Sequence, residues 1–372
     1  MRGCISRRKN GTYAYTIEMG KHPKTGRRRQ KMKAGFETKK EAEKALSIAL
    51  AEIGRGKYVE ETKETVQEYF TNYLEIKKPN LRPGTVKTYK WLINYHIIPK
   101  LGQIPIVRLT PSHLASMYEQ LRVTEGLSPQ TINHVHRVLY DGLATAVRHE
   151  VLGRNVAALI RPPKIPKYKA NVWTAEQLMK FLDYVKPYRY YMIILLAATC
   201  GLRRGEAIAL RWEDVDLHAK TITVNQSYTN GEKGFIFQPP KTAAGIRTIS
   251  LPDITVQALK KQKVIQAQDK LLAGPKYQDY GLVSQTKTGK PINPYYFEDR
   301  WLDMLAKSGL PKIRFHDLRH THASLLLKQN VHPKIVSERL GHSSVGITLD
   351  RYSHTYSVDY GAAEEMDEVL GR

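Results

Sequence analysis

Six polar residues in the C-terminal half of the chain could form a reaction centre. They are Arg203, Lys241, His316, Arg319, His342 and Tyr352. On a helix, His316 and Arg319 lie one turn apart, so we expect both side chains to point the same way. A buried core needs none of these polar groups. Together they could hold an anion next to a phenol that is able to attack it.

The chemistry that these residue types permit is phosphoryl transfer. Two guanidinium groups can donate paired hydrogen bonds to the non-bridging oxygens of a phosphate, whose charge must be held by fixed donors. A lysine on a mobile turn can give a proton to a leaving oxygen, and a tyrosine among cations is a usable nucleophile. Because the sequence shows no obvious carboxylate cluster for magnesium, we expect arginines and histidines to replace a metal, and no cofactor.

Simpler interpretations of the same residues stay open. His316 and His320 have the i, i+4 spacing of a zinc site, although the glutamate-bearing HExxH pattern is absent. Arg203 could instead form a structural ion pair with Glu206. A single histidine or tyrosine is also more often a satisfied structural residue than a catalytic one.

Net charge indicates the partner. The 372 residues carry a formal charge of +24, and the pI is near 9.8, which favours a polyanion such as nucleic acid over a merely solvated surface. The chain has two cysteines, Cys4 and Cys200, which are far apart in the sequence. They form no disulfide framework, which is typical of a protein in a reducing cytosol. The start lacks the apolar segment of a signal peptide, and the longest apolar run, Tyr191 to Leu202, is too short to cross a bilayer. We therefore expect no membrane association.

Residues 1–60 are expected to form a small, basic, DNA-binding domain. Thr12 to Met19 alternates like a strand, Arg27 to Lys33 favours another, and a capping box from Thr38 to Glu41 opens a helix. These features predict a three-stranded sheet with one helix rather than a flexible basic tail. Such a sheet can lie in a DNA major groove. The candidate contacts are Arg7, Arg8, Lys9, Arg27, Arg28 and Arg29.

Residues 65–160 are predicted to form an all-α domain. Apolar residues recur at helical spacing from Val66 to Leu74, and Thr110-Pro111 and Ser128-Pro129 are typical helix starts. Cations on the solvent side, Arg137 among them, could contact a DNA backbone or simply be solvated. A basic, proline-rich linker follows at 161–171, where we expect DNA contacts from Lys164 and Lys167.

Residues 172–372 are predicted to form a mostly α domain with a small antiparallel sheet, an α+β fold. A buried helix from Tyr190 to Cys200 ends at Gly201. Strands are expected at 221–226, 235–238 and 247–251, with 241–245 as the turn between the last two. Further helices are expected at about 253–270, 294–308, 316–329, 333–340 and 344–352.

Four segments resemble the sequence boxes of the tyrosine recombinases, also called phage-type integrases. T-C-G-L-R-R-G-E-A-I-A-L-R-W matches the first box and places Arg203 as a catalytic arginine. H-D-L-R-H-T-H-A-S matches the second and places His316 and Arg319. L-G-H-S-S, followed by D-R-Y-S-H, places His342 and the nucleophile Tyr352. P-K-T-A-A-G-I-R-T-I-S-L-P suggests that Lys241 is the family's hairpin lysine. The departure is Cys200, where the family more often has a hydroxyl residue.

The resemblance implies a site-specific DNA recombinase that integrates or excises a mobile element, such as a phage genome or a conjugative transposon. Residues 1–60 look like its arm-binding domain and 65–160 like its core-binding domain. Tyr352 would form a 3′-phosphotyrosyl link without ATP or a metal. The implied partners are core and arm sites on double-stranded DNA, a homotetramer, and, as candidates, a directionality factor and a host DNA-bending protein. The implied location is the bacterial cytoplasm, at the nucleoid.

Two other functions stay open from the sequence. A type IB topoisomerase shares the same chemistry but relaxes DNA without exchanging strands between sites. A DNA-binding regulator without catalysis would account for the positive charge, but it would not need the six-residue set.

Overall fold

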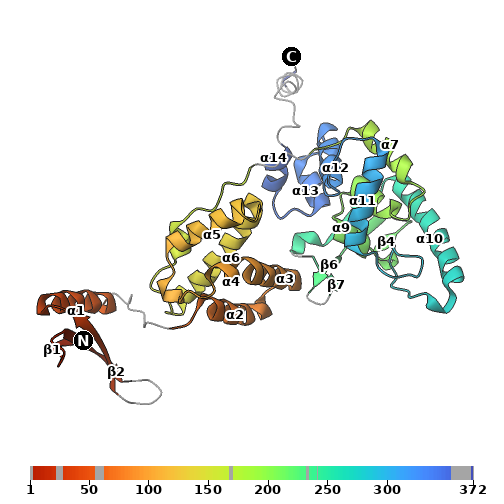
Figure 1. The fold of residues 1–372 in the computed structure, drawn as a ribbon. Helices are drawn as coiled ribbons and strands as arrows, with labels where there is room; N and C mark the ends of the chain where they lie inside the picture. Colours follow the sequence, from red (N-terminus) through yellow and green to blue (C-terminus); the bar gives the residue numbers. More distant parts are fainter. Residues whose placement is uncertain are drawn as a thin grey trace. The chain divides into compact units, whose positions relative to one another are not determined.

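A computed structural model of the protein describes residues 3–21, 28–54, 63–166, 171–231, 234–240, 242–352 and 370–371. The chain divides into two compact units, Met1–Pro166 and Lys167–Arg372. The first contains a small sheet and a helical bundle, and the second contains the helices and strands around the predicted reaction centre (Figure 1).

The N-terminal sheet has the three strands that the sequence predicts. Its elements are β1 (Gly3–Arg7), β2 (Tyr13–Lys21), β3 (Arg28–Phe36) and the helix α1 (Lys39–Gly54). The strands pair antiparallel in the order β1-β2-β3. Alternate residues of β2, Tyr15 and Ile17, are buried with Ala49 of α1, which explains the alternating pattern. The predicted capping box is present, because the amide of Glu41 donates to Oγ1 of Thr38 at 3.2 Å.

The next part of the chain is all-helical, as predicted. Its helices are α2 (Val66–Lys77), α3 (Pro83–Leu92), α4 (Ile98–Leu101), α5 (Pro111–Val123) and α6 (Pro129–Arg148), with a π-helical turn at Ile93–Ile97. Thr65, Thr110 and Ser128 cap the starts of α2, α5 and α6 through their side-chain oxygens. One apolar core joins these helices, with Phe70 and Leu139 completely buried in it.

The second unit is mostly helical around one large apolar core. Its helices are α7 (Ala175–Val185), α8 (Tyr191–Cys200), α9 (Arg204–Ala209), α10 (Asp253–Ala273), α11 (Pro294–Ser308), α12 (Asp317–Lys328), α13 (Pro333–Leu340) and α14 (Val345–Tyr352). The helix α8 is apolar nearly all round and is therefore buried in the centre. In the described part of the chain, no helix combines the length and the apolar character needed to cross a membrane.

The strands of this unit correct one prediction. They are β4 (Val215–Asp216), β5 (Thr221–Val224), β6 (Ser227–Gly231), β7 (Gly234–Gln238) and β8 (Arg247–Ser250). The sequence suggested a turn at 241–245 between two neighbouring strands. Instead, β7 pairs with β6, which was not predicted, and β8 pairs with β5. The segment between β7 and β8 therefore passes from one sheet to another. Alternation reveals strands but not their partners, because pairing depends on distant contacts.

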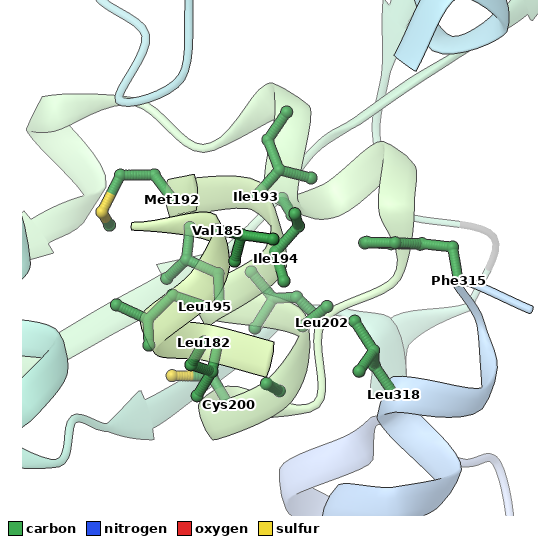
Figure 2. Close-up of a cluster of buried hydrophobic side chains, with 14 of the residues drawn as sticks. Leu182, Val185, Met192, Ile193, Ile194, Leu195, Cys200, Leu202, Phe315 and Leu318 are labelled. Carbon is green, nitrogen blue, oxygen red and sulfur yellow. The ribbon is translucent and has the colours of Figure 1, made fainter. Parts of the chain in front are cut away.

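One apolar cluster fixes the segments that carry predicted site residues. Leu202, Phe315 and Leu318 are buried with side chains of α7 and α8 (Figure 2). Each directly precedes a predicted site residue in the sequence, namely Arg203, His316 or Arg319. Because close-packed neighbours leave the apolar side chains little freedom, the backbone that carries the next residue is held in place as well.

Candidate active site

The C-terminal end of α13 presents three consecutive carbonyl groups, and each accepts a hydrogen bond from a different arginine. The pairs are Arg247 Nε to Arg339 O at 2.8 Å, Arg319 Nη2 to Leu340 O at 2.5 Å, and Arg203 Nη2 to Gly341 O at 3.4 Å. The last carbonyls of a helix lack partners inside it and carry its negative partial charge. This helix end therefore brings together two arginines that the sequence singled out, Arg203 and Arg319, although they are far apart along the chain.

Arg319 is buried between two helix ends. Its Nη1 donates to the carbonyl of Gly201 at 2.8 Å, so one guanidinium joins the ends of α8 and α13. Both helices end in a left-handed glycine, with φ of 67° at Gly201 and 65° at Gly341. A Cβ at Gly201 would lie 2.7 Å from Leu340, and one at Gly341 would lie 2.8 Å from the carbonyl of Ala244. Glycine is thus required at both positions by the backbone angle and by space.

A buried carboxylate, Glu206, joins Arg203 to Arg247. Its Oε1 accepts from Arg203 Nη1 at 2.7 Å, and its Oε2 accepts from Arg247 Nη2 at 2.8 Å. Burial by itself would raise the pKa of Glu206, but Arg247 and Arg203 outweigh it and lower the pKa to about 2. The alternative ion pair between Arg203 and Glu206 is therefore present. It still leaves the Arg203 side chain 41% exposed, so the same guanidinium remains open to a ligand.

His316 precedes α12 as its N-cap residue, at the surface. The residue as a whole is exposed, while the surrounding protein partly desolvates its ring. That partial desolvation, followed by the positive charges of Arg319 and Arg203, lowers the pKa of His316 to about 4. The imidazole is therefore neutral at pH 7. It meets the ring of His320 edge to face, with centroids 5.1 Å apart. In the described ranges, no three His, Cys, Asp or Glu side chains gather in a way that could hold a metal.

His342 follows directly after the carbonyls that bind the arginines. Its Nδ1 and the Oγ1 of Thr348 share a hydrogen bond of 2.8 Å, and Thr348 is a completely buried residue of α14. Tyr352 is the last residue of α14, four positions after Thr348. The helix that carries the predicted nucleophile is thus bonded to the rest of the site through His342.

Lys241 lies outside the described residues, but the turn that follows it belongs to the site. The carbonyl of Gly245 accepts from Arg247 Nη1 at 3.0 Å, and Ala244 lies against Gly341. The structure thus places the described members of the predicted set, or the backbone that carries them, around one helix end.

The predicted DNA contacts lie mostly in the first unit. Arg7, Arg8 and Lys9 are exposed on or beside β1, and Arg137 is exposed on α6. Arg28 and Arg29 belong to β3. Lys164 is exposed in a segment without regular structure, which is held to α6 by a 2.6 Å hydrogen bond from Asn133 Nδ2 to the carbonyl of Pro163. Arg27 and Lys167 fall outside the described residues.

Two arginines of the site, Arg247 and Arg339, escaped the sequence analysis. A signal for Arg247 existed, because it occupies an inward position of β8, next but one to the buried Ile249. An arginine on the apolar face of a strand needs a buried partner, which here is Glu206. Nothing in the local sequence marks Arg339, which lies on a short amphipathic helix among other polar residues.

This arrangement can bind an anion. Arg203 and His316 are open to solvent, His342 is partly so, and the buried Arg319 lies next to them. Guanidinium and imidazole groups in this arrangement suit the non-bridging oxygens of a phosphodiester. The geometry therefore agrees with the chemistry that the residue types suggest.

Comparisons with known proteins identify relatives of each part of the chain. Residues 172–358 match the Phage integrase family, 6–53 match an Arm DNA-binding domain, and 65–121 match a Phage integrase, N-terminal SAM-like domain. A tyrosine recombinase XerC-like protein of Caldanaerobacter subterraneus subsp. tengcongensis is 30% identical, over 93% of this chain and 93% of its own. The ICEBs1 integrase of Bacillus subtilis is 27% identical, over 98% of this chain and its full length.

Solved structures show the same fold. The Tn1549 transposon integrase in complex with a circular intermediate DNA has a TM-score of 0.68 and 20% identity, over 82% of this chain and 99% of that one. These comparisons favour a recombinase over the two alternatives, a relaxing topoisomerase and a regulator without catalysis.

The carboxylate of Glu206 should stabilise the second unit strongly. We expect Glu206→Gln to lower the free energy of unfolding by about 3–5 kcal/mol, because it leaves two cations side by side without their anion. Glu298→Gln is the matched control, since it removes the same charge beside Arg204 from a pair in which both side chains are more than a third exposed. It should cost about 0–1 kcal/mol.

Urea unfolding followed by tryptophan fluorescence measures this difference, because three of the four tryptophans belong to the second unit: Trp173, Trp212 and Trp301. Equal effects of the two substitutions would contradict a central role for Glu206.

Proposed function

The chain belongs to the phage integrase family and is a site-specific DNA recombinase of the tyrosine type, and we propose that it breaks and rejoins DNA strands through Tyr352. The observation that carries this proposal is the end of α13. There Arg319 and Arg203 donate to two consecutive carbonyl groups, those of Leu340 and Gly341, just before His342. We assign residues 1–60 to arm-site binding, 65–160 to core-site binding and 172–372 to catalysis, with 161–171 as the linker.

In the proposed reaction, the phenol oxygen of Tyr352 attacks a backbone phosphorus and gives up its proton to solvent water. The bond from phosphorus to the 5′ oxygen breaks, which leaves a 3′-phosphotyrosyl link and a free 5′-hydroxyl. Lys241 gives a proton to that leaving oxygen. In the second step, the 5′-hydroxyl of the partner duplex attacks the phosphotyrosine and releases the phenol. One phosphoester is exchanged for another, so the sequence of steps needs no ATP.

Arg203, Arg319, His316 and His342 would hold the phosphate in the transition state. The two guanidiniums supply fixed positive charge to the non-bridging oxygens, and their own carbonyl partners keep them oriented before DNA arrives. His316, whose pKa is lowered to about 4, would meet the phosphate as a neutral donor. Once bound, the anionic phosphate would raise this pKa, because a negative charge nearby stabilises the protonated imidazole.

The assembly follows from the number of bonds to be broken. Exchange between two duplexes needs four strand cleavages, and each cleavage uses one tyrosine, which supports a homotetramer on paired core sites.

Arg7, Arg8 and Lys9, exposed on or beside β1, would bind separate arm sites. A directionality factor and a host DNA-bending protein are proposed as further partners, and the nucleoid of the bacterial cytoplasm as the place of action. Phage and conjugative element are both proposed as origins of the mobile DNA.

Replacing Tyr352 by phenylalanine should abolish the covalent protein–DNA adduct and leave DNA binding intact, because only the attacking oxygen is lost. The adduct is measured on a denaturing gel, and binding by gel shift with the same labelled duplex. Tyr356→Phe removes the phenol that lies four positions further along the sequence and should still form the adduct. Normal cleavage by Tyr352→Phe would refute the assignment of the nucleophile.

Removal of residues 1–60 should spare cleavage of a core-site duplex but reduce integrative recombination between full sites, because arm binding is lost. The triple substitution Arg7→Glu, Arg8→Glu and Lys9→Glu should act in the same direction, since it reverses three exposed positive charges that would meet the DNA backbone. Recombination yield on a two-plasmid assay measures both. Unchanged yield from full sites would argue against an arm-binding role.

A further inference from the structure

We propose that Arg339 is a positioning residue for strand cleavage, with His322 as the acceptor that orients it. This inference rests on the proposed function, because it concerns the geometry of Arg319 toward the phosphate. Arg339 is not one of the groups that would touch DNA. It acts through the backbone segments that hold Arg319.

The side chain of Arg339 reaches three separate elements. Its Nη2 donates to the carbonyls of Thr199, at 3.1 Å, and of Ser250, at 3.0 Å. Its Nη1 donates to Ser250 Oγ at 3.1 Å, and its Nε to His322 Nε2 at 3.1 Å. One planar guanidinium therefore joins the end of α8, the end of β8 and the middle of α12. These acceptors are all neutral, so this arginine serves geometry rather than charge pairing.

The bonded segments are the ones that orient Arg319. Its two acceptors are the carbonyls of Gly201, just past the end of α8, and of Leu340, at the end of α13. Arg339 belongs to α13 by its backbone and binds the end of α8 at Thr199, two residues before Gly201. Arg339 thereby sets the separation of the two carbonyls between which the Arg319 guanidinium lies.

His322 can accept from Arg339 only as a neutral imidazole with its proton on Nδ1. That proton points at the carbonyl of Ala198, 3.0 Å away, which leaves Nε2 free to accept. Burial and the charge of Arg339 lower the pKa of His322 to about 3, in agreement with this tautomer. His322 lies three residues after Arg319 on α12, and its ring contacts Gly201 closely enough to exclude a Cβ there, at 2.8 Å.

This arrangement predicts a defect in the chemical step rather than in DNA binding. If Arg319 is displaced by a fraction of an ångström, it still attracts DNA, but it no longer meets the oxygens of the transition state. At metal sites, residues that orient the ligating side chains typically contribute about 10- to 100-fold to activity, and we expect an effect of similar size from a residue that orients a phosphate-binding arginine. Substitution of a residue that serves only the fold would instead lower activity in proportion to the fraction of unfolded protein.

The test compares Arg339→Gln with Arg189→Gln in the full-length protein. Arg189 is a suitable control because it is also partly buried in the second unit, where it makes hydrogen bonds of 2.7 and 2.9 Å to Asp269. The probe is a nicked suicide duplex with the core site found by sequencing genomic fragments trapped on the wild-type protein. Single-turnover adduct formation at saturating protein gives the rate, gel shift gives the Kd, and circular dichroism gives the folded fraction.

For Arg339→Gln we expect a cleavage rate lowered by roughly 10- to 100-fold, an unchanged Kd and an unchanged folded fraction. Arg189→Gln should cleave at the wild-type rate per folded molecule. A second substrate replaces one non-bridging oxygen at the cleaved phosphate by a methyl group, which removes the charge that Arg319 would hold. On this methylphosphonate, the difference between Arg339→Gln and wild type should shrink, whereas a folding defect would persist on both substrates.

His322 gives an independent pair of variants. His322→Gln places an amide oxygen where Nε2 lay and should keep most of the rate, whereas His322→Phe fills the space without an acceptor and should show the Arg339→Gln defect. The proposal is overturned if Arg339→Gln cleaves at the wild-type rate, or if its loss follows the folded fraction or persists on the methylphosphonate. Absence of any adduct from the wild-type protein would instead refute the proposed function itself.

Discussion

The site depends on one physical fact, which is that the last carbonyls of a helix have no partners within that helix. At the end of α13, the carbonyls of residues 339, 340 and 341 accept hydrogen bonds from Arg247, Arg319 and Arg203, respectively. The helix dipole makes this end favourable for cations. Neutral backbone groups can thus orient several guanidiniums without cancelling their charge, which a set of carboxylates would do. A site intended for a phosphate needs that property.

Crowding of positive charge has a cost, and Glu206 offsets part of it. The carboxylate is buried between Arg203 and Arg247, whose charges lower its pKa to about 2 and favour its charged form. The pKa of His316 is lowered as well, by partial desolvation and by the charges of Arg319 and Arg203, which keeps this imidazole neutral. Arg203 keeps 41% of its side chain exposed, so part of the positive charge stays accessible to a ligand. A DNA phosphate, which is the ligand proposed above, would complete this balance of charge.

Much of the fold was predictable because the signals are local. The capping box at Thr38, the N-cap and proline pairs at Thr110 and Ser128, and helical periodicity all depend on neighbours within one turn. The bounds of α11 and α13 agree with the expected 294–308 and 333–340. The strand pairing of β6 with β7 and of β5 with β8 was not predictable in this way, because alternation carries no information on partners.

The sequence by itself determined which groups could react and what they would meet: six residues in a family order, and a net charge of +24 that calls for a polyanion. The tertiary structure alone decided how those groups are held. Arg203 meets Gly341 across 138 positions, and Arg319 meets Gly201 across 118. Arg247 and Arg339 acquire their roles only when α8, β8, α12 and α13 converge. Local patterns encode helices and caps, whereas a hydrogen bond between distant segments exists only after the chain has packed its core.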